Sequence, residues 1–217
     1  METFVAVAVF AAAFLLGSIP WGVIISRVFY HTDIREHGSG NIGTTNAMRT
    51  MGKVGGGAVF VLDFGKGLAA GVIALLAVGA ADAALGDAAR LSYHDFAGIA
   101  FLGCVWGHIF SPWLKFKGGK GVAVAVGCLF VFFGWQGALI EIALFAILVV
   151  ATRYVSVGSI AAAVLCPVLA AYSFLYATFS PVAFTCATIA ALTVVWAHRG
   201  NISRLRAGDE RRIGGKK

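Results

Sequence analysis

Charged residues are scarce in this sequence of 217 residues: Asp, Glu, Lys and Arg make up only 12% of it, while 59% of the residues are hydrophobic. A soluble domain is typically about 25% charged, so this chain has too few polar residues to face water on all sides. The shortage excludes an ordinary soluble domain. It predicts a single all-α domain over residues 1–217, a polytopic integral membrane bundle, because lipid offers no hydrogen-bonding partner to an open sheet edge.

The sequence also lacks the motifs of several common sites. Its four cysteines lie in apolar runs without a C-x-x-C spacing, so we expect neither a disulfide framework nor a zinc site. The five histidines include no H-E-x-x-H motif, and no G-x-S-x-G nucleophile elbow occurs. No metal and no cofactor are therefore expected. The basic residues belong to no recognised nucleic-acid-binding module, so no nucleic acid is expected as a partner.

Apolar runs of membrane-spanning length recur along the chain, and a bilayer core takes about 20 helical residues. The first run has no basic stretch before it, which favours a span over a cleavable signal. The run over 122–151 is too long for one span and is expected to divide near Gly134-Trp135-Gln136-Gly137, where glycines and polarity favour a turn. The sequence thus predicts about seven transmembrane helices, over residues 4–28, 58–80, 96–113, two within 122–151, 157–176 and 181–197.

The basic residues predict the orientation, because cytoplasmic loops of membrane proteins carry an excess of Lys and Arg. With this division into spans, 15 of the 17 Lys and Arg fall on one side, Arg90 lies on the other, and Lys66 lies inside the second span. The C-terminus is therefore expected in the cytoplasm and the N-terminus outside. The cytoplasmic group is Arg27, Arg35, Arg49, Lys53, Lys115, Lys117, Lys120, Arg153, Arg199, Arg204, Arg206, Arg211, Arg212, Lys216 and Lys217.

Three segments on the cytoplasmic side, 31–57, 116–121 and 198–205, are too rich in glycine and polar residues for ordinary connectors. Glycines let backbone N–H groups approach an anion, Ser and Thr add hydroxyl groups, and Arg and Lys add charge. Lys120 and its glycines also open the fourth span, whose N-terminal N–H groups would form a seat for phosphate. The spacing around Lys120 is not that of a P-loop, G-x-x-x-x-G-K-[ST]. Together the segments predict a cytoplasmic site for phosphorylated substrates.

Ionisable residues inside spans need a reason, since each costs at least about 2.5 kcal/mol at a helix centre. Asp63 and Lys66 lie three residues apart in the second span and so share a helical face. They form either an internal ion pair that holds the helix in the bundle or a border of the phosphate site. Glu141 either lies near the outer boundary or bonds a neighbouring helix. The sequence leaves both alternatives open.

A set of short motifs occurs in a fixed order along the chain: Gly17-Ser18-Ile19-Pro20, Gly38-Ser39-Gly40-Asn41, Thr45-Asn46 with Arg49, Asp63 with Lys66-Gly67, Gly107-His108, Phe116 to Gly121, and His198 to Leu205. No His is followed five positions later by Asp, the pairing of acyl-CoA-dependent glycerolipid acyltransferases. The ordered set resembles one known family, the acyl-phosphate-dependent glycerol-3-phosphate acyltransferases (PlsY) of bacteria. The resemblance runs from Gly17 to Glu210, and position 44 is Thr where the family often has Ala.

The resemblance implies transfer of a fatty acyl group from acyl phosphate to the 1-hydroxyl of glycerol 3-phosphate, giving lysophosphatidic acid and phosphate. The family has seven spans with its N-terminus outside. The implied location is the bacterial cytoplasmic membrane, with the site facing the cytoplasm, membrane lipids around it, and possible functional coupling to a soluble enzyme that forms acyl phosphate. The implied catalytic residues are Ser39, Arg49, Lys120, His198 and Asn201. The implied substrate- and phosphate-binding residues are Asn41, Thr45, Asn46, Gly118, Gly119 and Gly121, with Glu210 closer to structure than to chemistry.

Two questions remain open at this point. The hydroxyl proton could go to a phosphate oxygen of the donor, as the family resemblance implies, or to His198 acting as a general base. The competing function is a membrane transporter for a small anion such as phosphate or glycerol 3-phosphate. Transporters more often show internal repeats and half-helices that meet at the membrane midplane, and no convincing repeat is found here.

Overall fold

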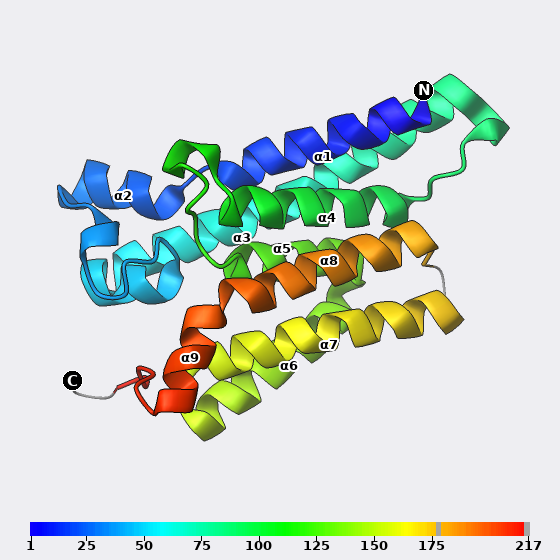
Figure 1. Cartoon of the computed structure of the whole chain (residues 1–217). Helices are drawn as coiled ribbons and strands as arrows, with labels where there is room; N and C mark the ends of the chain where they lie inside the picture. Colours follow the sequence, from blue (N-terminus) through cyan, green and yellow to red (C-terminus); the bar gives the residue numbers. More distant parts are fainter. Residues whose placement is uncertain (177–178, 215–217) are drawn as a thin grey trace.

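The computed structural model describes residues 1–176 and 179–214, and this part of the chain is helical with no strand. The helices run roughly along one common direction, and the N-terminus lies at the opposite end of the bundle from the segment 199–214 (Figure 1). The helices are α1 (Glu2–Ser18), α2 (Trp21–Tyr30), α3 (Thr44–Leu85), α4 (Tyr93–Ile109), α5 (Val122–Phe132), α6 (Gly134–Thr152), α7 (Val155–Tyr176), α8 (Pro181–Ala197) and α9 (Arg199–Ala207). Short 3-10 turns cover Ile34–Glu36, Gly86–Ala88 and Pro112–Leu114.

The expected all-helical membrane protein is confirmed, but the division into spans differs in detail. Five helical segments are long and apolar enough to cross a membrane: Glu2–Tyr30, Thr44–Leu85, Tyr93–Leu114, Gly134–Thr152 and Val155–Tyr176. A sixth results if α8 and α9, which meet at a bend of 47°, count as one broken span. The helix α5 has 11 residues, roughly 16 Å at 1.5 Å per residue, and is too short to cross a bilayer core alone.

Two breaks divide the long apolar runs of the sequence. The first predicted span is interrupted at Pro20, which lacks an N–H and precedes the first residue of α2. The predicted division within 122–151 is confirmed, although it falls at Phe133, one residue before the expected turn. The break at Pro20 lies near the end of the molecule where α2, the start of α3, the loop before α5, and α9 gather (Figure 1).

Close helix contacts explain several of the 28 glycines. A Cβ on Gly17 of α1 would overlap the backbone of Cys104 in α4, and one on Gly107 would overlap the backbone carbonyl of Phe14. Gly67 of α3 and Gly127 of α5 meet in the same way. Small residues are the usual means by which helix backbones approach each other in lipid, and these glycines allow that approach here.

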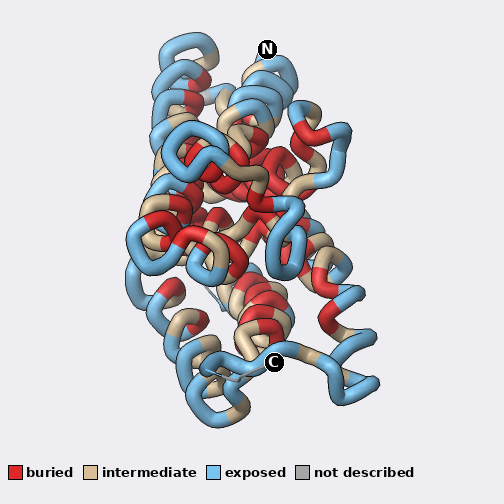
Figure 2. The backbone as a smooth tube through the Cα atoms, turned by 90° about the vertical axis from the view of Figure 1, so that its left-hand side faces the viewer, coloured by how far each residue is buried: buried red, intermediate tan, exposed pale blue. Residues whose placement is uncertain are grey.

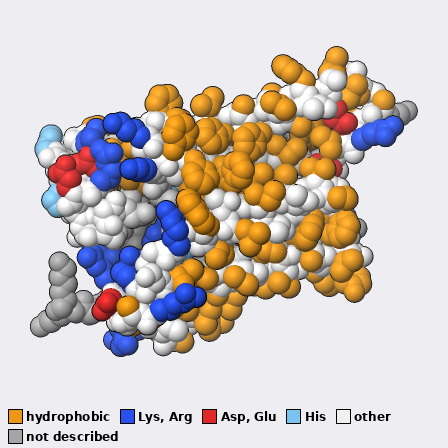
Figure 3. Space-filling view, viewed as in Figure 1, with side chains coloured by type: hydrophobic (Ala, Val, Ile, Leu, Met, Phe, Trp, Pro, Cys, Tyr) orange, Lys and Arg blue, Asp and Glu red, His pale blue; other side chains and the backbone are white. Residues whose placement is uncertain are grey.

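The most buried helix is α4, which lies at the centre of the bundle. Buried residues gather on the inside of the bundle, while the outer faces of the surrounding helices stay exposed (Figure 2). Those outer faces carry a broad band of apolar side chains, and Lys and Arg gather at the end that holds α2 and α9 (Figure 3). The band suits contact with lipid tails, and the charged end suits a headgroup layer and water.

Candidate active site

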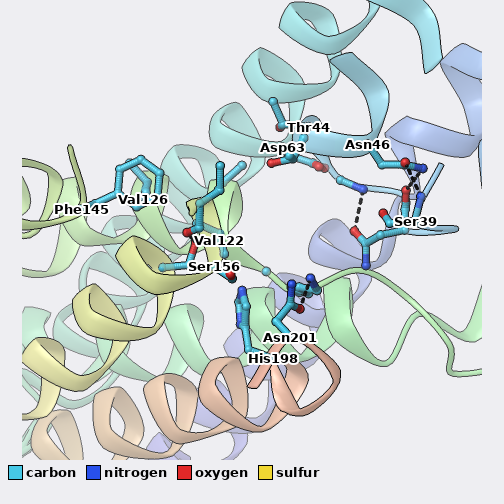
Figure 4. Close-up of a pocket in the computed structure, with 18 of the residues that line it drawn as sticks. Ser39, Thr44, Asn46, Asp63, Val122, Val126, Phe145, Ser156, His198 and Asn201 are labelled. Atoms are coloured by element: carbon cyan, nitrogen blue, oxygen red, sulfur yellow. Dashed lines mark hydrogen bonds between the residues drawn. The ribbon is translucent and has the colours of Figure 1, made fainter. Parts of the chain in front are cut away.

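A cavity of about 540 Å³ runs from the charged end into the bundle between α3, α5, α6, α7 and α9. Its polar part joins all three of the segments singled out in the sequence. In Figure 4, Ser39, Thr44, Asn46 and Asp63 lie across the cavity from His198 and Asn201. The polar lining comprises Gly38, Ser39, Asn41, Gly43, Thr44, Thr45, Asn46, Arg49, Asp63, His108, Lys120, Gly121, Ser156, His198, Asn201, Arg204, Glu210 and Arg211.

The segment 31–57 is not the loop that its polarity suggested. It becomes helical at Thr44, and α3 carries Thr45, Asn46 and Arg49 on its first two turns before a kink at Gly52, where φ is 72° and ψ −170°. The helix N-terminus therefore faces the cavity, where its unpaired N–H groups favour an anion. The segment 198–205 likewise forms α9 and not a loop.

Asn46 fixes the conformation of the loop that precedes α3. Its side chain is 2% exposed. Its Oδ1 accepts a hydrogen bond from the Ser39 N–H at 2.8 Å, and its Nδ2 lies within 2.8–3.1 Å of the carbonyl oxygens of Ile34, His37 and Asn41. Because these contacts occupy the whole amide, Asn46 organises the loop and leaves the Ser39 hydroxyl and the Asn41 side chain at the cavity.

Arg49 is the cation of α3 that lines the cavity. Its guanidinium forms no salt bridge or hydrogen bond with any residue that the structure describes. A guanidinium presents five N–H donors in a planar fork that matches carboxylate and phosphate. Arg49 therefore has its full donor capacity available for an anionic ligand.

The glycine-rich segment before α5 divides into two parts. Gly118 N–H donates to the Ile109 carbonyl at 2.9 Å and Gly119 N–H to the His108 carbonyl at 3.1 Å, and neither glycine lines the cavity. Gly121 does line it and adopts φ 79°, a left-handed conformation that suits glycine, as the N-cap of α5. The unpaired N–H groups of the first turn of α5 follow directly, at Val122 and Ala123. The structure thus brings Lys120 and Gly121 to the site, whereas Gly118 and Gly119 anchor the segment on α4.

Lys120 is tied to α9 by a network of side chains. Its Nζ donates to Asn201 Oδ1, Asn201 Nδ2 donates to Glu210 Oε1 at 2.5 Å, and Arg204 Nε donates to Glu210 Oε2 at 2.8 Å. Burial lowers the pKa of Lys120 to about 8; Glu210 opposes this effect, and Arg204 adds to it. Burial disfavours the charge of Glu210, but hydrogen bonds from Asn201 and Arg204 outweigh it and hold the pKa of that carboxyl below its usual range.

His198 lies directly after α8 and is 2% exposed. Its Nδ1 is 2.8 Å from the Val194 carbonyl oxygen. A carbonyl can only accept, so Nδ1 carries the proton and a neutral ring leaves Nε2 as an acceptor. Burial lowers the pKa of His198 to about 4, with Lys120 acting in the same direction. The side chain is therefore neutral near pH 7 and can accept a hydrogen bond from a substrate hydroxyl.

Some lining residues were not found from the sequence as site residues. Ser156, in the first turn of α7, is buried, and its hydroxyl has no hydrogen-bond partner among the described residues. No motif surrounds it, and only the fold brings it beside His198 in the cavity lining (Figure 4). Arg211 adds a further cation from the segment after α9, where the sequence shows only a basic tail. Asp63, whose role the sequence left open, also borders the cavity.

The inner part of the cavity is apolar. It lies between α5, α6 and α7 and is lined by Val126, Leu129, Ile142, Phe145 and Ala162. Glu141 of α6 faces this part and is 3% exposed, with no hydrogen-bond partner for Oε1 among the described residues. Its place inside the bundle, and not at the outer boundary, removes one of the two alternatives for this residue.

The fold and the site define a polytopic helical membrane protein with a cavity that is cationic at one end and apolar inside. The glycerol-3-phosphate acyltransferase family matches residues 7–208. The chain belongs to this family, and the family expectation from the sequence is confirmed. The match supports an acyltransferase over the transporter alternative.

Similar proteins agree with this assignment. The chain is 40% identical over 211 residues to the glycerol-3-phosphate acyltransferase of Rhodopseudomonas palustris (strain BisB5), covering 97% of each chain. It is 38% identical over 207 residues to that of Prochlorococcus marinus (strain MIT 9301), covering 93% of this chain and 94% of the other. The crystal structure of PlsY (YgiH), an integral membrane glycerol 3-phosphate acyltransferase, in its glycerol 3-phosphate form superposes with a TM-score of 0.81 at 33% identity over 96% of both chains.

Proposed function

We propose that this chain transfers a fatty acyl group from acyl phosphate to the 1-hydroxyl of glycerol 3-phosphate, releasing lysophosphatidic acid and phosphate. The observation that carries the proposal is the cavity itself, which joins a cluster of cations to an apolar inner part. Both substrates carry a phosphate group, and only the donor and the product carry a long hydrocarbon chain. A similar protein of known structure has been crystallised in a glycerol 3-phosphate form.

The polar part has enough positive charge for two phosphate groups. Arg49, Lys120, Arg204 and Arg211 line it, and Glu210 is the carboxylate nearest to them in the lining. The first turns of α3 and α5 add backbone N–H donors. Acyl phosphate is already an activated mixed anhydride, so the protein's main tasks are orientation and charge stabilisation.

The apolar part between α5, α6 and α7 suits the acyl chain. The donor's carbonyl then lies where the two parts meet, close to Lys120 and the start of α5. Glycerol 3-phosphate enters from the charged end, which we place in the cytoplasm of a bacterium, with the N-terminus outside and the bundle in the cytoplasmic membrane. A soluble enzyme that forms acyl phosphate would supply the donor on that same side.

The hydroxyl proton goes to a phosphate oxygen of the donor in this proposal. His198 is a weak base, because burial lowers its pKa to about 4. Its Nε2 instead accepts a hydrogen bond from the attacking hydroxyl and orients it. Asn201 and Glu210 hold Lys120 toward the developing phosphate.

The test is formation of lysophosphatidic acid by the purified protein in lipid nanodiscs, measured by mass spectrometry with palmitoyl phosphate and glycerol 3-phosphate. Product that requires both substrates is expected, and Arg49→Ala should lower its rate at limiting glycerol 3-phosphate. A parallel arm measures uptake of labelled glycerol 3-phosphate into liposomes that contain the protein. Uptake without acylation would contradict the proposal in favour of a transporter.

A further inference from the structure

Three ionisable side chains lie buried together beneath the polar cavity, on helices that the membrane surrounds. Lys66 Nζ of α3 lies 2.9 Å from Asp63 Oδ1, 2.9 Å from the Ile19 carbonyl oxygen and 3.1 Å from His108 Nδ1 of α4. The side chains of Asp63 and Lys66 are each 2% exposed. An ionisable group at this depth costs at least about 2.5 kcal/mol when unpaired. Asp63 and Lys66 pair with each other, and both also lie within 4 Å of His108.

The contacts of Lys66 determine which nitrogen of His108 carries a proton. An ammonium group has N–H donors and no acceptor, so Lys66 Nζ is the donor in its 3.1 Å contact with His108 Nδ1. His108 Nδ1 must therefore accept, so the neutral ring carries its proton on Nε2. Asp63 Oδ1 lies at ion-pair distance from Lys66, and the Ile19 carbonyl, at the break between α1 and α2, accepts a hydrogen bond from it.

The Nε2 edge of His108 meets the segment that carries Lys120. The imidazole fills the position where a side chain on Gly119 would lie, and a Cβ there would overlap Nε2. The carbonyl oxygens of His108 and Ile109 accept the N–H groups of Gly119 and Gly118. His108 also lines the cavity, and Nε2 has no hydrogen-bond partner among the described residues. A ring N–H donor without a partner in the described part of the protein therefore lies beside the segment that carries Lys120, on a residue that lines the cavity.

We propose that His108 is a phosphate-binding residue, that it donates its Nε2–H to a phosphate oxygen held beside Lys120, and that Asp63 and Lys66 position it by fixing this tautomer. The proposal rests on the proposed function and adds to it a neutral donor from α4. It also explains Gly119, since any side chain at that position would displace the ring from the site. The ligand is a phosphate group, which glycerol 3-phosphate, acyl phosphate and inorganic phosphate share.

Two substitutions separate the two nitrogens of the ring. The amide of His108→Gln reaches about as far as Nε2 and can still donate, whereas that of His108→Asn reaches only about as far as Nδ1. A matched control is His94→Asn, at the far end of the same helix and outside the cavity lining. We expect His108→Asn to raise the inhibition constant of inorganic phosphate about tenfold or more, as loss of a hydrogen bond to a charged group does. His108→Gln should stay within about threefold of wild type, and His94→Asn should match wild type.

The KM values for glycerol 3-phosphate and for acyl phosphate show which substrate's phosphate His108 binds, since only one of them should rise with the inhibition constant. Wild-type values in His108→Asn, or equal losses in His108→Asn and His108→Gln, would overturn the proposal. The second result would assign the ring to packing alone.

A direct measurement does not depend on variants that fold. In wild-type protein labelled with ¹⁵N-histidine, His108 should show a protonated Nε2 and an unprotonated Nδ1, and inorganic phosphate should shift the Nε2 resonance. A proton on Nδ1, or no response to phosphate, would overturn the proposal. If the wild-type protein forms no lysophosphatidic acid, the proposed function fails, and the phosphate response alone then decides the role of His108.

Discussion

Lys120 Nζ donates a hydrogen bond to Oδ1 of Asn201, although the two residues lie 81 positions apart in the sequence. This contact joins the segment before α5 to α9 and so closes the polar cavity from two sides. Asn201 is itself held by Glu210, which also bonds Arg204. The lysine therefore reaches the cavity in a fixed direction, with a pKa that depends on its burial.

The first prediction concerns the pH dependence that Lys120 imposes. Burial lowers its pKa to about 8, so the free protein loses this charge as pH rises through that value. The ratio kcat/KM for glycerol 3-phosphate should be level below about pH 7 and fall about tenfold per pH unit well above pH 8. In Lys120→Arg, whose guanidinium stays charged, the falling limb should disappear even if the rate is lower. An unchanged limb in Lys120→Arg would assign it to another group.

The second prediction concerns Arg49, which has no partner among the described side chains. Arg49→Ala should raise KM for glycerol 3-phosphate about 10- to 100-fold, because a hydrogen bond to a charged group is worth about 1.5–3 kcal/mol. Arg49→Lys should restore only part of this loss, since an ammonium cannot form the bidentate contact. Arg27→Ala is the matched control: this arginine lies at the same end, pairs with Asp33 and does not line the cavity. An equal effect of Arg27→Ala would indicate a general effect of surface charge.

The third prediction separates the loop organiser Asn46 from the cavity residue Ser39. Asn46→Ala leaves buried carbonyl groups without a donor, which costs about 1–3 kcal/mol for each unsatisfied group. The Tm of this variant should fall, and KM should rise because the loop loses its conformation. Ser39→Ala should lower kcat while Tm stays close to that of the wild type. Thermal unfolding and steady-state kinetics on the same samples compare the two, and equal Tm values for both variants would refute the assignment.

The fourth prediction concerns orientation. Single cysteines at Glu36, on the charged end, and at Ala88, on the opposite end, are introduced after the four native cysteines are replaced; both positions are exposed. In intact cells, an impermeant thiol reagent should label position 88 and should label position 36 only after lysis. Ready labelling of position 36 in intact cells would reverse the proposed topology.

Much of this architecture could be predicted from the sequence, because lipid demands long apolar helices and the basic residues gather at one end. The start of α3 and the contacts of the segment 116–121, both at the charged end, could not be predicted from the sequence. The first turns of α3 are polar and include Gly52 at φ 72°, so local propensity suggests a loop, and only packing over the cavity shows a helix. The 116–121 segment shows the reverse case. The resemblance implied phosphate contacts at Gly118, Gly119 and Gly121, but the N–H groups of Gly118 and Gly119 bond α4.

Charge and position pointed to Lys120 and Arg49, and the resemblance implied Asn201; all three line the cavity. Ser156 and His108 were not assigned to the site, because each enters the cavity through helix packing between segments far apart in the sequence. The hydrogen bond from Lys66 Nζ to the Ile19 carbonyl could not be predicted either, because every residue has a backbone carbonyl and the sequence does not show which one the lysine reaches.

The most direct test of the account is the identity of the acyl donor. The measurement is release of phosphate by the purified protein with glycerol 3-phosphate and palmitoyl phosphate, run beside formation of lysophosphatidic acid from palmitoyl-CoA, each with and without EDTA. The account predicts turnover with palmitoyl phosphate that EDTA does not reduce, and none with palmitoyl-CoA. Full activity with palmitoyl-CoA, or loss of activity in EDTA, would contradict it.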